Sequence, residues 1–389
     1  MMERRYDLDW LRVIAFALLI FYHIGMFFVP WGWHIKNNVI YDWLEYPMLF
    51  LNRWRMPLLF IISGMGTAYS LGKRSASQFS KERLSRLLIP LIFGMLVIIP
   101  PQVYIERIAH LQFNGSYLDY WPSHAFKGAY PQGNLSWHHL WFLPYILIYS
   151  LILLPVFIYL RKHPHNQLNR SFIKLTESRF GLFYLILPLV LMEWFLDPFF
   201  PATHALIDDW FNFFYSLTLF FYGFMLISIQ KQFFNAVEKH YKSYIIIGIL
   251  AFSIFLFLIE TFEDGYKRHF IEAVINQINT WAWILALFGI ASVYGNKPSN
   301  TIKYCNRAVY PFYILHQTVI VILAYWLMNL NWNLASKFTM LVIGTFLICA
   351  VLYEFVIKRW YILNVVMGVK PKDNQTIIKL KRYFNFKNT

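Results

Sequence analysis

The sequence predicts an all-α, polytopic integral membrane protein with about ten transmembrane helices and with both termini in the cytoplasm. Of the 389 residues, 58% are hydrophobic and only 14% are charged, which is more apolar than a soluble domain requires. Apolar runs of about 20 residues, the length that crosses a hydrocarbon core, recur from end to end. Most of the 35 Lys and Arg residues lie in alternate connections between these runs.

The ten apolar runs are the predicted transmembrane helices, and no change in composition between them marks a second folded domain. They cover roughly residues 10–30, 47–72, 84–105, 138–160, 181–199, 210–230, 242–262, 271–294, 308–329 and 338–357. We therefore expect a transmembrane domain at 1–360 and a basic cytoplasmic tail at 361–389 that rests on anionic lipid. The first run is too long for a signal peptide and contains Arg12 and His23, so we expect it to be retained.

The net charge of +15 is compatible with binding to nucleic acid or with a membrane topology, and the placement of the basic residues distinguishes the two. With a cytoplasmic N-terminus, the inner segments that hold most of them are 4–5, 73–86, 161–179, 231–242, 297–307 and 358–387. This positive-inside bias indicates a lipid bilayer, and no nucleic acid, as the partner. The only cysteines, Cys305 and Cys349, imply neither a disulfide framework nor a cysteine-based zinc site, and we expect no metal.

The first apolar run contains the strongest local signal for function, because ionisable residues inside a membrane helix are costly and are usually functional. Arg12 and His23 are eleven residues apart, which places them on one helix face and roughly 16 Å apart along the axis. A guanidinium at the inner mouth can hold phosphate, and a deeper imidazole can act as general base or acyl carrier. In the structural alternative, Arg12 snorkels or pairs with Asp9, and His23 bonds a neighbouring helix.

The second run and the inner connection that follows it add weaker candidates. Arg55 lies at the outer side, where it favours a dicarboxylic acyl group or contacts the acceptor. Ser63 belongs to a group of small residues that permits close approach of a ligand or of another helix. Arg83 and Arg86 share a helix face and can clamp the phosphates of a donor, although a positive-inside topology alone supplies similar charge.

Further candidates lie along the later runs. His139 follows His138 at the outer start of the fourth run, and adjacent histidines diverge too far to form a metal pair by themselves. Glu193 and His316 are ionisable residues in apolar runs, for which structural and catalytic roles remain equally open. The outer segment 106–137, rich in Gly, Pro and aromatic residues, predicts an ordered lid or a sugar platform, although interfacial aromatics are also ordinary membrane anchors.

Five motifs in order give the sequence its resemblance to a known family, the integral-membrane acyltransferase family three. The motifs are Asp9–Arg12 with His23 eleven residues later, Arg55-Met56 leading to Phe60–Gly64, Arg83-x-x-Arg86 before Pro90, His139-Leu140-Trp141-Phe142-Leu143, and Tyr313-Ile314-Leu315-His316-Gln317. The resemblance covers roughly residues 4–360. Within the family, the chain looks most like the group that adds succinyl groups to periplasmic glucans.

The resemblance implies ten core helices, a cytoplasmic acyl-coenzyme A donor with an acetyl or succinyl group, and an envelope glycan hydroxyl as acceptor in a Gram-negative inner membrane. It also implies that Arg12 and His23 are catalytic and that Arg83 and Arg86 bind the donor. Arg55, Ser63, His139, Trp141, Glu193 and His316 are the further substrate-binding candidates, and no permanently bound cofactor is expected. Because the soluble domain of some relatives has no counterpart here, acceptor handling is expected to rest on outer loops, on an accessory protein or on a homo-oligomer.

Two other functions fit parts of this pattern. A glycan or lipid exporter would use the buried Arg, His and Glu residues as a gated path, but we find no internal repeat of the kind that many transporters show. A non-catalytic scaffold would leave His23, Glu193 and His316 without a shared purpose. Consumption of a thioester distinguishes the enzyme from the exporter.

Overall fold

The computed structural model describes residues 4–369, and this part of the chain forms helices without a β-sheet. Residues 370–389 of the predicted cytoplasmic tail lie outside the described residues. The α-helices are α1 (Tyr6–Gly25), α2 (Glu45–Leu71), α3 (Ala76–Arg83), α4 (Ile89–Phe93), α5 (Pro100–Ala109), α6 (Tyr117–Ser123), α7 (Phe142–Ile152), α8 (Leu154–Lys162), α9 (Gln167–Thr176), α10 (Ile186–Phe195), α11 (Trp210–Ser228), α12 (Gln230–Thr261), α13 (Tyr266–Gly295), α14 (Asn300–Leu327), α15 (Leu334–Val351) and α16 (Tyr361–Val366). π-Helical turns at Leu84–Leu88, Gly94–Ile98 and Leu352–Ile357 extend three of these helices.

The protein is a multi-pass membrane protein. Within the described residues, seven helical segments are long and apolar enough to cross a bilayer. They are Tyr6–Gly25, Ala76–Ala109, Trp210–Ser228, Gln230–Thr261, Tyr266–Gly295, Asn300–Leu327 and Leu334–Ile357. His138–Ile152 and Leu154–Lys162, which are bent by 53° where they meet, make an eighth if the pair forms one broken span and not a re-entrant loop.

Two of the ten predicted spans differ from these eight. The run at 47–72 does form the 27-residue helix α2, but its polar residues, Arg53 and Arg55 among them, make it less apolar than the other spans. The run at 181–199 forms the shorter apolar helical segment Gly181–Phe195. A total of ten crossings requires both of these segments to cross, so that number stays a prediction.

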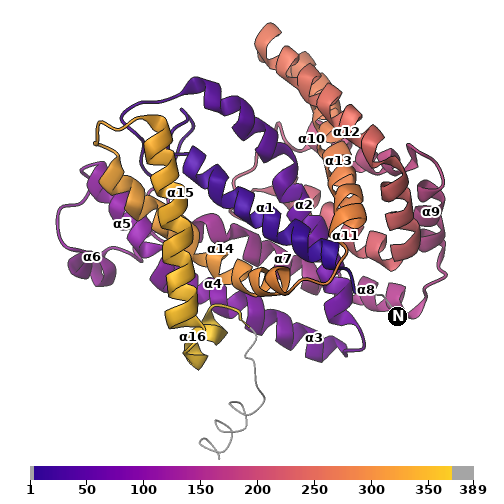
Figure 1. Cartoon of the computed structure of the whole chain (residues 1–389), viewed down its shortest axis with the longest axis horizontal. Coiled ribbons are helices and arrows are strands. Elements are labelled where there is room, and N and C mark those ends of the chain that lie inside the picture. Colours follow the sequence, from indigo (N-terminus) through magenta and orange to yellow (C-terminus); the bar gives the residue numbers. More distant parts are fainter. Residues whose placement is uncertain (1–3, 370–389) are drawn as a thin grey trace, which may run out of the picture.

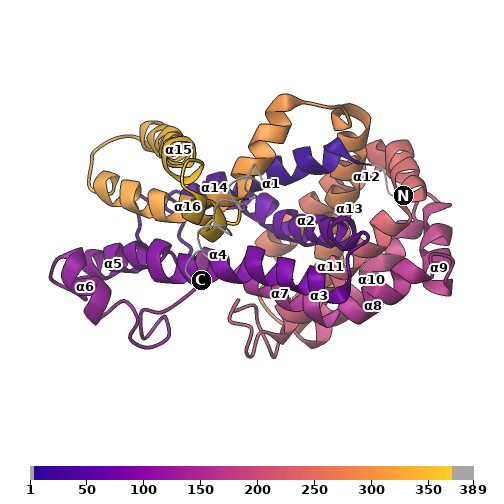
Figure 2. The same cartoon turned by 90° about the horizontal axis from the view of Figure 1, so that it is seen from below.

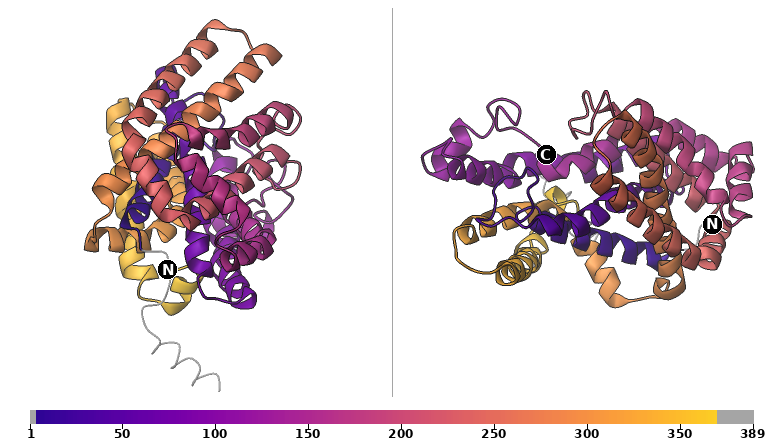
Figure 3. Two further views of the ribbon diagram at one scale, coloured as in Figure 1. Left: turned by 90° about the vertical axis from the view of Figure 1, so that its right-hand side faces the viewer. Right: turned by 90° about the horizontal axis from the view of Figure 1, so that it is seen from above.

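The central part of the molecule is built around α1. This helix packs against α2, α13 and α14, so residues from the beginning and the end of the chain lie side by side (Figure 1). Seen from below, α5 and α6 lie at one end of the molecule and α9 at the other (Figure 2). The hairpin of α12 and α13 projects beyond the other helices (Figure 3).

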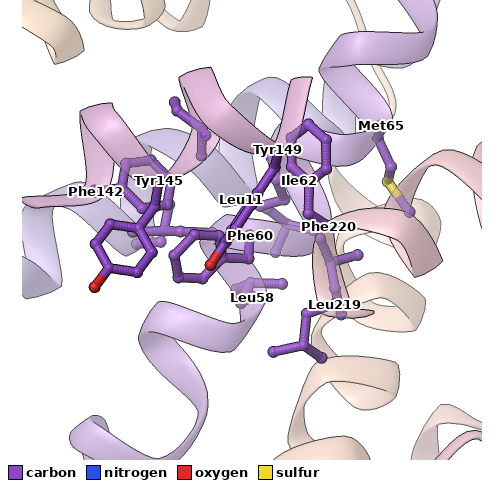
Figure 4. Close-up of a cluster of buried hydrophobic side chains, with 14 of the residues drawn as sticks. Leu11, Leu58, Phe60, Ile62, Met65, Phe142, Tyr145, Tyr149, Leu219 and Phe220 are labelled. Carbon is purple, nitrogen blue, oxygen red and sulfur yellow. The ribbon is translucent and has the colours of Figure 1, made fainter. Parts of the chain in front are cut away.

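The core beside α1 is a cluster of aromatic and aliphatic side chains from α1, α2, α7 and α11 (Figure 4). Helices α2 and α11 approach so closely that glycine is required on both sides. A Cβ atom at Gly64 would lie 1.9 Å from the carbonyl oxygen of Phe220, and one at Gly223 would lie 2.0 Å from that of Ile61. These two glycines hold α2, which carries Arg55 and Ser63, in a fixed position.

The segment predicted as a lid or sugar platform is ordered. Its helix α6 begins with a capping box formed by Ser116 and Asp119. Arg107 donates to the carbonyl oxygens of Pro131 and Gly133, at 2.8 and 2.7 Å, and closes the second half of the segment against α5. These bonds give the segment the rigidity that either role needs.

Candidate active site

The centre of the site is a pair of imidazoles from opposite ends of the chain. His23 lies near the end of α1 and His316 lies in α14, and their rings stack with centroids 5.0 Å apart and an interplanar angle of 4°. The His23 Nδ1 and His316 Nε2 atoms are 2.8 Å apart. The two rings therefore share a hydrogen bond across the α1/α14 contact.

The neighbours of His316 determine which nitrogens carry protons. Its Nδ1 lies 2.7 Å from the carbonyl oxygen of Tyr313, and a carbonyl oxygen only accepts, so Nδ1–H is the donor. In the neutral ring, His316 Nε2 is then the acceptor and His23 Nδ1–H donates to it. Among the described residues, Nε2 of His23 has no hydrogen-bond partner, and this partly exposed side chain therefore presents a free basic nitrogen.

A third imidazole packs against this pair. The His139 ring meets the His316 ring edge-on with centroids 5.2 Å apart, and its Nε2–H donates to the carbonyl oxygen of Ile314 at 3.0 Å. Although three histidines gather here, residues 4–369 contain no group of three His, Cys, Asp or Glu side chains arranged to hold a metal ion. The arrangement suits hydrogen bonding and proton transfer.

A chain of buried polar side chains leads from the histidines toward the outer segment. Gln317, next to His316, donates to Gln102 Oε1 at 3.1 Å and to His34 Nε2 at 3.0 Å. His34 Nδ1–H donates to Glu106 at 2.5 Å, and Tyr130 donates to the same carboxylate at 3.1 Å. Burial raises the pKa of Tyr130 to about 12, so this outer tyrosine remains a proton donor at neutral pH.

Arg55 lies on the other side of the pair. Its guanidinium stacks on the Tyr22 ring at 3.9 Å, and it is near enough to interact electrostatically with both His23 and His316. The side chain is only 2% exposed. The structure thus brings Arg55, His23, His139 and His316 together.

Below these residues a cavity of about 1270 Å³ is lined by the N-terminal segment, the α2–α3 connection, the start of α14 and the segment after α15. Its basic residues are Arg4, Arg5, Arg12, Arg74, Arg83, Arg86, Lys303, Arg307 and Lys358, against the acids Asp9 and Glu82. All of these segments belong to the predicted inner side, and the cavity gathers them at one end of the protein. We call it the inner cavity.

Arg12 is held in the wall of the inner cavity by a neighbouring helix. Its Nη1 donates to Asn306 Oδ1 in α14 at 3.1 Å and lies 3.8 Å from Asp9. Asn306 donates in turn to Asp9 at 2.7 Å. The pairing of Arg12 with Asp9 is therefore present, but Arg12 also faces the cavity with a side chain that is 32% exposed.

Arg83 and Arg86 line the same cavity, where α3 passes into the first π-helical turn. π-Turns occur often at functional sites because they shift the helix face by one residue. Glu82 lies 3.7 Å from Arg86 and 3.6 Å from Arg74, whereas Arg83 stacks on Phe79 and has no carboxylate within 4 Å among the described residues. Positive charge therefore exceeds the negative charge that the cavity itself supplies.

The group of small residues in α2 divides between the two expected roles. Ser63 and Gly66 line the inner cavity, and a Cβ atom at Gly66 would lie 3.5 Å from Arg12 Nη2. Gly64 instead packs on α11. The cavity and the neighbouring helix thus meet different faces of the same turn.

The inner cavity ends below the histidine pair. Phe16, Phe142 and Tyr313 line its far end, and the Phe16 and Tyr313 rings lie with centroids 5.2 Å apart. Tyr313 is fixed because its hydroxyl donates to the carbonyl oxygen of His139 at 2.6 Å. Phe16 and Phe142 thus complete the lining of the cavity beside Tyr313.

Trp141 and Glu193 lie away from the histidines. The Trp141 ring packs on His204 with centroids 4.0 Å apart, in the connection before α11. Glu193 in α10 accepts from Gln277 at 2.6 Å and from Asn276 at 3.3 Å. Both side chains have partners of their own in this structure, so their assignment to substrate remains a prediction.

Several polar residues of this region were not among the sequence candidates. Asn306 orients Arg12, and Gln102 and His34 belong to the outer polar chain. A signal was available for Gln102, since a buried amide within an apolar run needs a partner. Asn306 and His34 lie outside the apolar parts of their segments and gave no such signal.

Comparisons with known proteins identify the family of the chain. Residues 5–354 match the acyltransferase domain of the acyltransferase 3 family. The chain belongs to this family.

The curated proteins to which the chain is similar are distant in sequence. The chain is similar to "Glucans biosynthesis protein C" of Salmonella agona, with 25% identity over 228 residues, which are 58% of this chain and 57% of the relative. It is 26% identical to the protein of that name from Salmonella schwarzengrund over 229 residues, again 58% and 57% of the two chains. The matched part thus spans little more than half of these relatives. No solved structure gives a significant match.

Proposed function

We propose that this protein transfers an acyl group, acetyl or succinyl, from acyl-coenzyme A on the cytoplasmic side of the inner membrane to a hydroxyl of an envelope carbohydrate. The observation that carries the proposal is the histidine pair above a basic cavity. His23 presents a free Nε2, and its other nitrogen is held by His316. The names of the relatives support a glucan as the carbohydrate.

The inner cavity supplies a site for the donor. Guanidinium groups bind phosphate through paired, charge-assisted hydrogen bonds, and Arg83, Arg86 and Arg12 line one wall of the cavity. With the phosphates there, the pantetheine arm extends along α1 toward His23, over the roughly 16 Å that separates Arg12 from His23 along the helix. Phe16 and Phe142 turn aside to admit the thioester.

The residues of the site then account for each bond and proton of the transfer step. The acceptor oxygen attacks the thioester carbon while His23 Nε2 takes the hydroxyl proton. The new C–O bond forms, the C–S bond breaks, and the proton passes from His23 to the departing sulfur. His316 keeps His23 Nδ1 protonated, so that the free lone pair stays on the nitrogen that faces the reactants.

The test is release of free coenzyme A by purified protein given acetyl- or succinyl-coenzyme A with and without envelope glucan. We expect glucan-stimulated release that is abolished in His23→Ala and kept in His163→Ala, an exposed histidine at the end of α8. Full activity of folded His23→Ala contradicts the mechanism. Glucan movement across vesicles without coenzyme A release favours the exporter.

The same preparation distinguishes a base from an acyl carrier. Radiolabelled acyl-coenzyme A without acceptor leaves no label on the protein when His23 acts as a base. Acid-stable label that is absent in His23→Ala establishes an acyl-histidine instead.

A further inference from the structure

Arg55 differs from every other buried charged side chain that the structure describes. In residues 4–369 these are Asp7, Arg55, Glu106, Asp209 and Lys337. Asp7 pairs with Arg5 at 2.5 Å, and Glu106 accepts from His34. Asp209 accepts from Asn212 at 2.7 Å, and Lys337 donates to Asn37 at 2.6 Å.

Arg55 has no carboxylate partner among the described residues, and its interaction with the neutral Tyr22 side chain compensates its charge less. Its Nε and Nη1 atoms are buried and have no hydrogen-bond partner, and no described carboxylate forms an ion pair with it. Its one close aromatic neighbour is the Tyr22 ring. An unpaired buried guanidinium costs several kcal/mol, so a cation of this kind is expected to meet an anion during function.

The position of Arg55 restricts which anion that is. Arg55 stacks on the Tyr22 ring, and the Tyr22 and His23 ring centroids are 5.9 Å apart, so Arg55 lies beside the pair of rings at which the proposed transfer takes place. The inner cavity that would hold the donor phosphates is lined by other arginines and does not include Arg55. The anion therefore belongs to the reacting end of the donor and not to its coenzyme end.

We propose that Arg55 is a catalytic residue that stabilises the negative charge developing on the acyl carbonyl oxygen during transfer. When the acceptor oxygen attacks, an electron pair of the C=O bond moves onto that oxygen, and it returns when the C–S bond breaks. The free Nε–H and Nη1–H donors are already in place and already stripped of water, which makes such stabilisation effective. This inference rests on the proposed function and assigns Arg55 a role other than selecting the acyl group.

The alternative anion is the distal carboxylate of a dicarboxylic acyl group, and kinetics separate the two. A carbonyl oxygen is common to all donors, and its full charge exists only in the transition state. Loss of Arg55 then lowers kcat for every donor with little change in KM. A carboxylate exists only in dicarboxylic donors and is charged before reaction, so its loss raises KM for those donors alone.

The experiment measures coenzyme A release by Arg55→Gln with acetyl- and succinyl-coenzyme A. We expect kcat to fall about 10²–10³-fold with both donors, the usual effect of removing one oxyanion donor. Arg53→Gln is the matched control. Arg53 lies two residues earlier on α2, also has an unpartnered Nε and stacks on Phe255 of α12, and the kcat of its variant should stay within about threefold of wild type.

Two results overturn the inference. A loss confined to succinyl-coenzyme A and seen in KM makes Arg55 a donor-recognition residue, and an unchanged kcat with both donors makes it structural. If Arg55→Gln does not fold, Arg55→Lys carries the test, since it keeps the charge without the paired donors and must lower kcat equally for both donors. Wild-type protein that turns over neither donor contradicts the proposed function itself.

Discussion

His316, the hydrogen-bond partner of His23, determines which nitrogen of His23 carries the proton. With only a stacked neighbour, His23 could carry its proton on either nitrogen. Because His316 Nδ1–H donates to the Tyr313 carbonyl oxygen, His316 Nε2 is left as an acceptor. The proton of His23 therefore stays on Nδ1. Under the proposed function, we expect His316 to act as a positioning residue, comparable to the third group that orients a base in other acyl-transfer enzymes.

This assignment predicts a graded effect of substitutions at His316. His316→Ala should lower kcat at least about tenfold, because the Nε2 lone pair of His23 is no longer favoured. His316→Gln should recover part of the loss, since its Oε1 can accept from His23 Nδ1–H. Coenzyme A release at saturating donor measures both. Equal losses in the two variants, with unchanged melting temperatures, would sink the positioning role.

The cavity arginines lead to a second prediction at the same scale. Arg83→Gln and Arg86→Gln should each raise KM for acyl-coenzyme A about tenfold or more, because one charge-assisted hydrogen bond contributes about 1.5–3 kcal/mol. kcat should change little. Arg170→Gln, an exposed substitution on α9, is the control for charge alone. A KM that rises equally in all three variants would show that only the surface potential matters.

Sequence reasoning reached some of these residues and missed others for a physical reason. Arg12 and His23 stand out because an apolar helix rarely contains ionisable side chains. The pairing of His23 with His316 spans 293 positions and depends on how α1 packs on α14, which no local pattern encodes. Their joint catalytic use remains a prediction.

At the scale of elements, the contact between α2 and α11 fixes the geometry of the site. Gly64→Ala should lower stability by about 1–3 kcal/mol or more, since its Cβ would overlap a backbone oxygen that cannot rotate away. Thermal unfolding in detergent measures this. Gly265→Ala is the control, because a Cβ there meets nothing within 4 Å. An unchanged melting temperature for Gly64→Ala would contradict the close packing.

Some features of the helices could be predicted from the sequence, and others could not. Apolar runs located most of the helices, because burial in lipid demands length and hydrophobicity. They did not foresee the 53° bend after Ile152 or the two π-turns that follow Arg83, since these depend on packing and on hydrogen bonds within the helix. The residues 63–66 showed that something approaches closely, but not which face meets the cavity.

At the scale of the whole molecule, the predicted topology concerns the number of membrane crossings and the side on which the inner cavity lies. Segments rich in Lys and Arg lie together around the inner cavity, as an even number of crossings between them requires. The charge bias predicts that this end faces the cytoplasm. Both α2 and the short apolar segment Gly181–Phe195 must cross for the count to be ten.

Single cysteines in the full-length chain, with Cys305 and Cys349 replaced by Ser, test this topology. Gln132→Cys and Ala202→Cys should react with a membrane-impermeant maleimide in intact spheroplasts, whereas His165→Cys should react only after lysis. All three positions are exposed. Labelling of position 165 without lysis would invert the topology, and protection of position 202 would remove the fifth crossing.

The free nitrogen of His23, between a donor cavity on one side and an acceptor on the other, also has an electrical consequence under the proposed function. The acyl group moves outward as the equivalent of an acyl cation while the acceptor's proton moves inward onto sulfur, so acetyl transfer carries no net charge across the bilayer. A succinyl group takes one negative charge outward, and an inside-negative potential favours that step by about 2.3 kcal/mol per 100 mV. Respiring and de-energised cells would therefore differ in how fully they succinylate their envelope, but not in how fully they acetylate it.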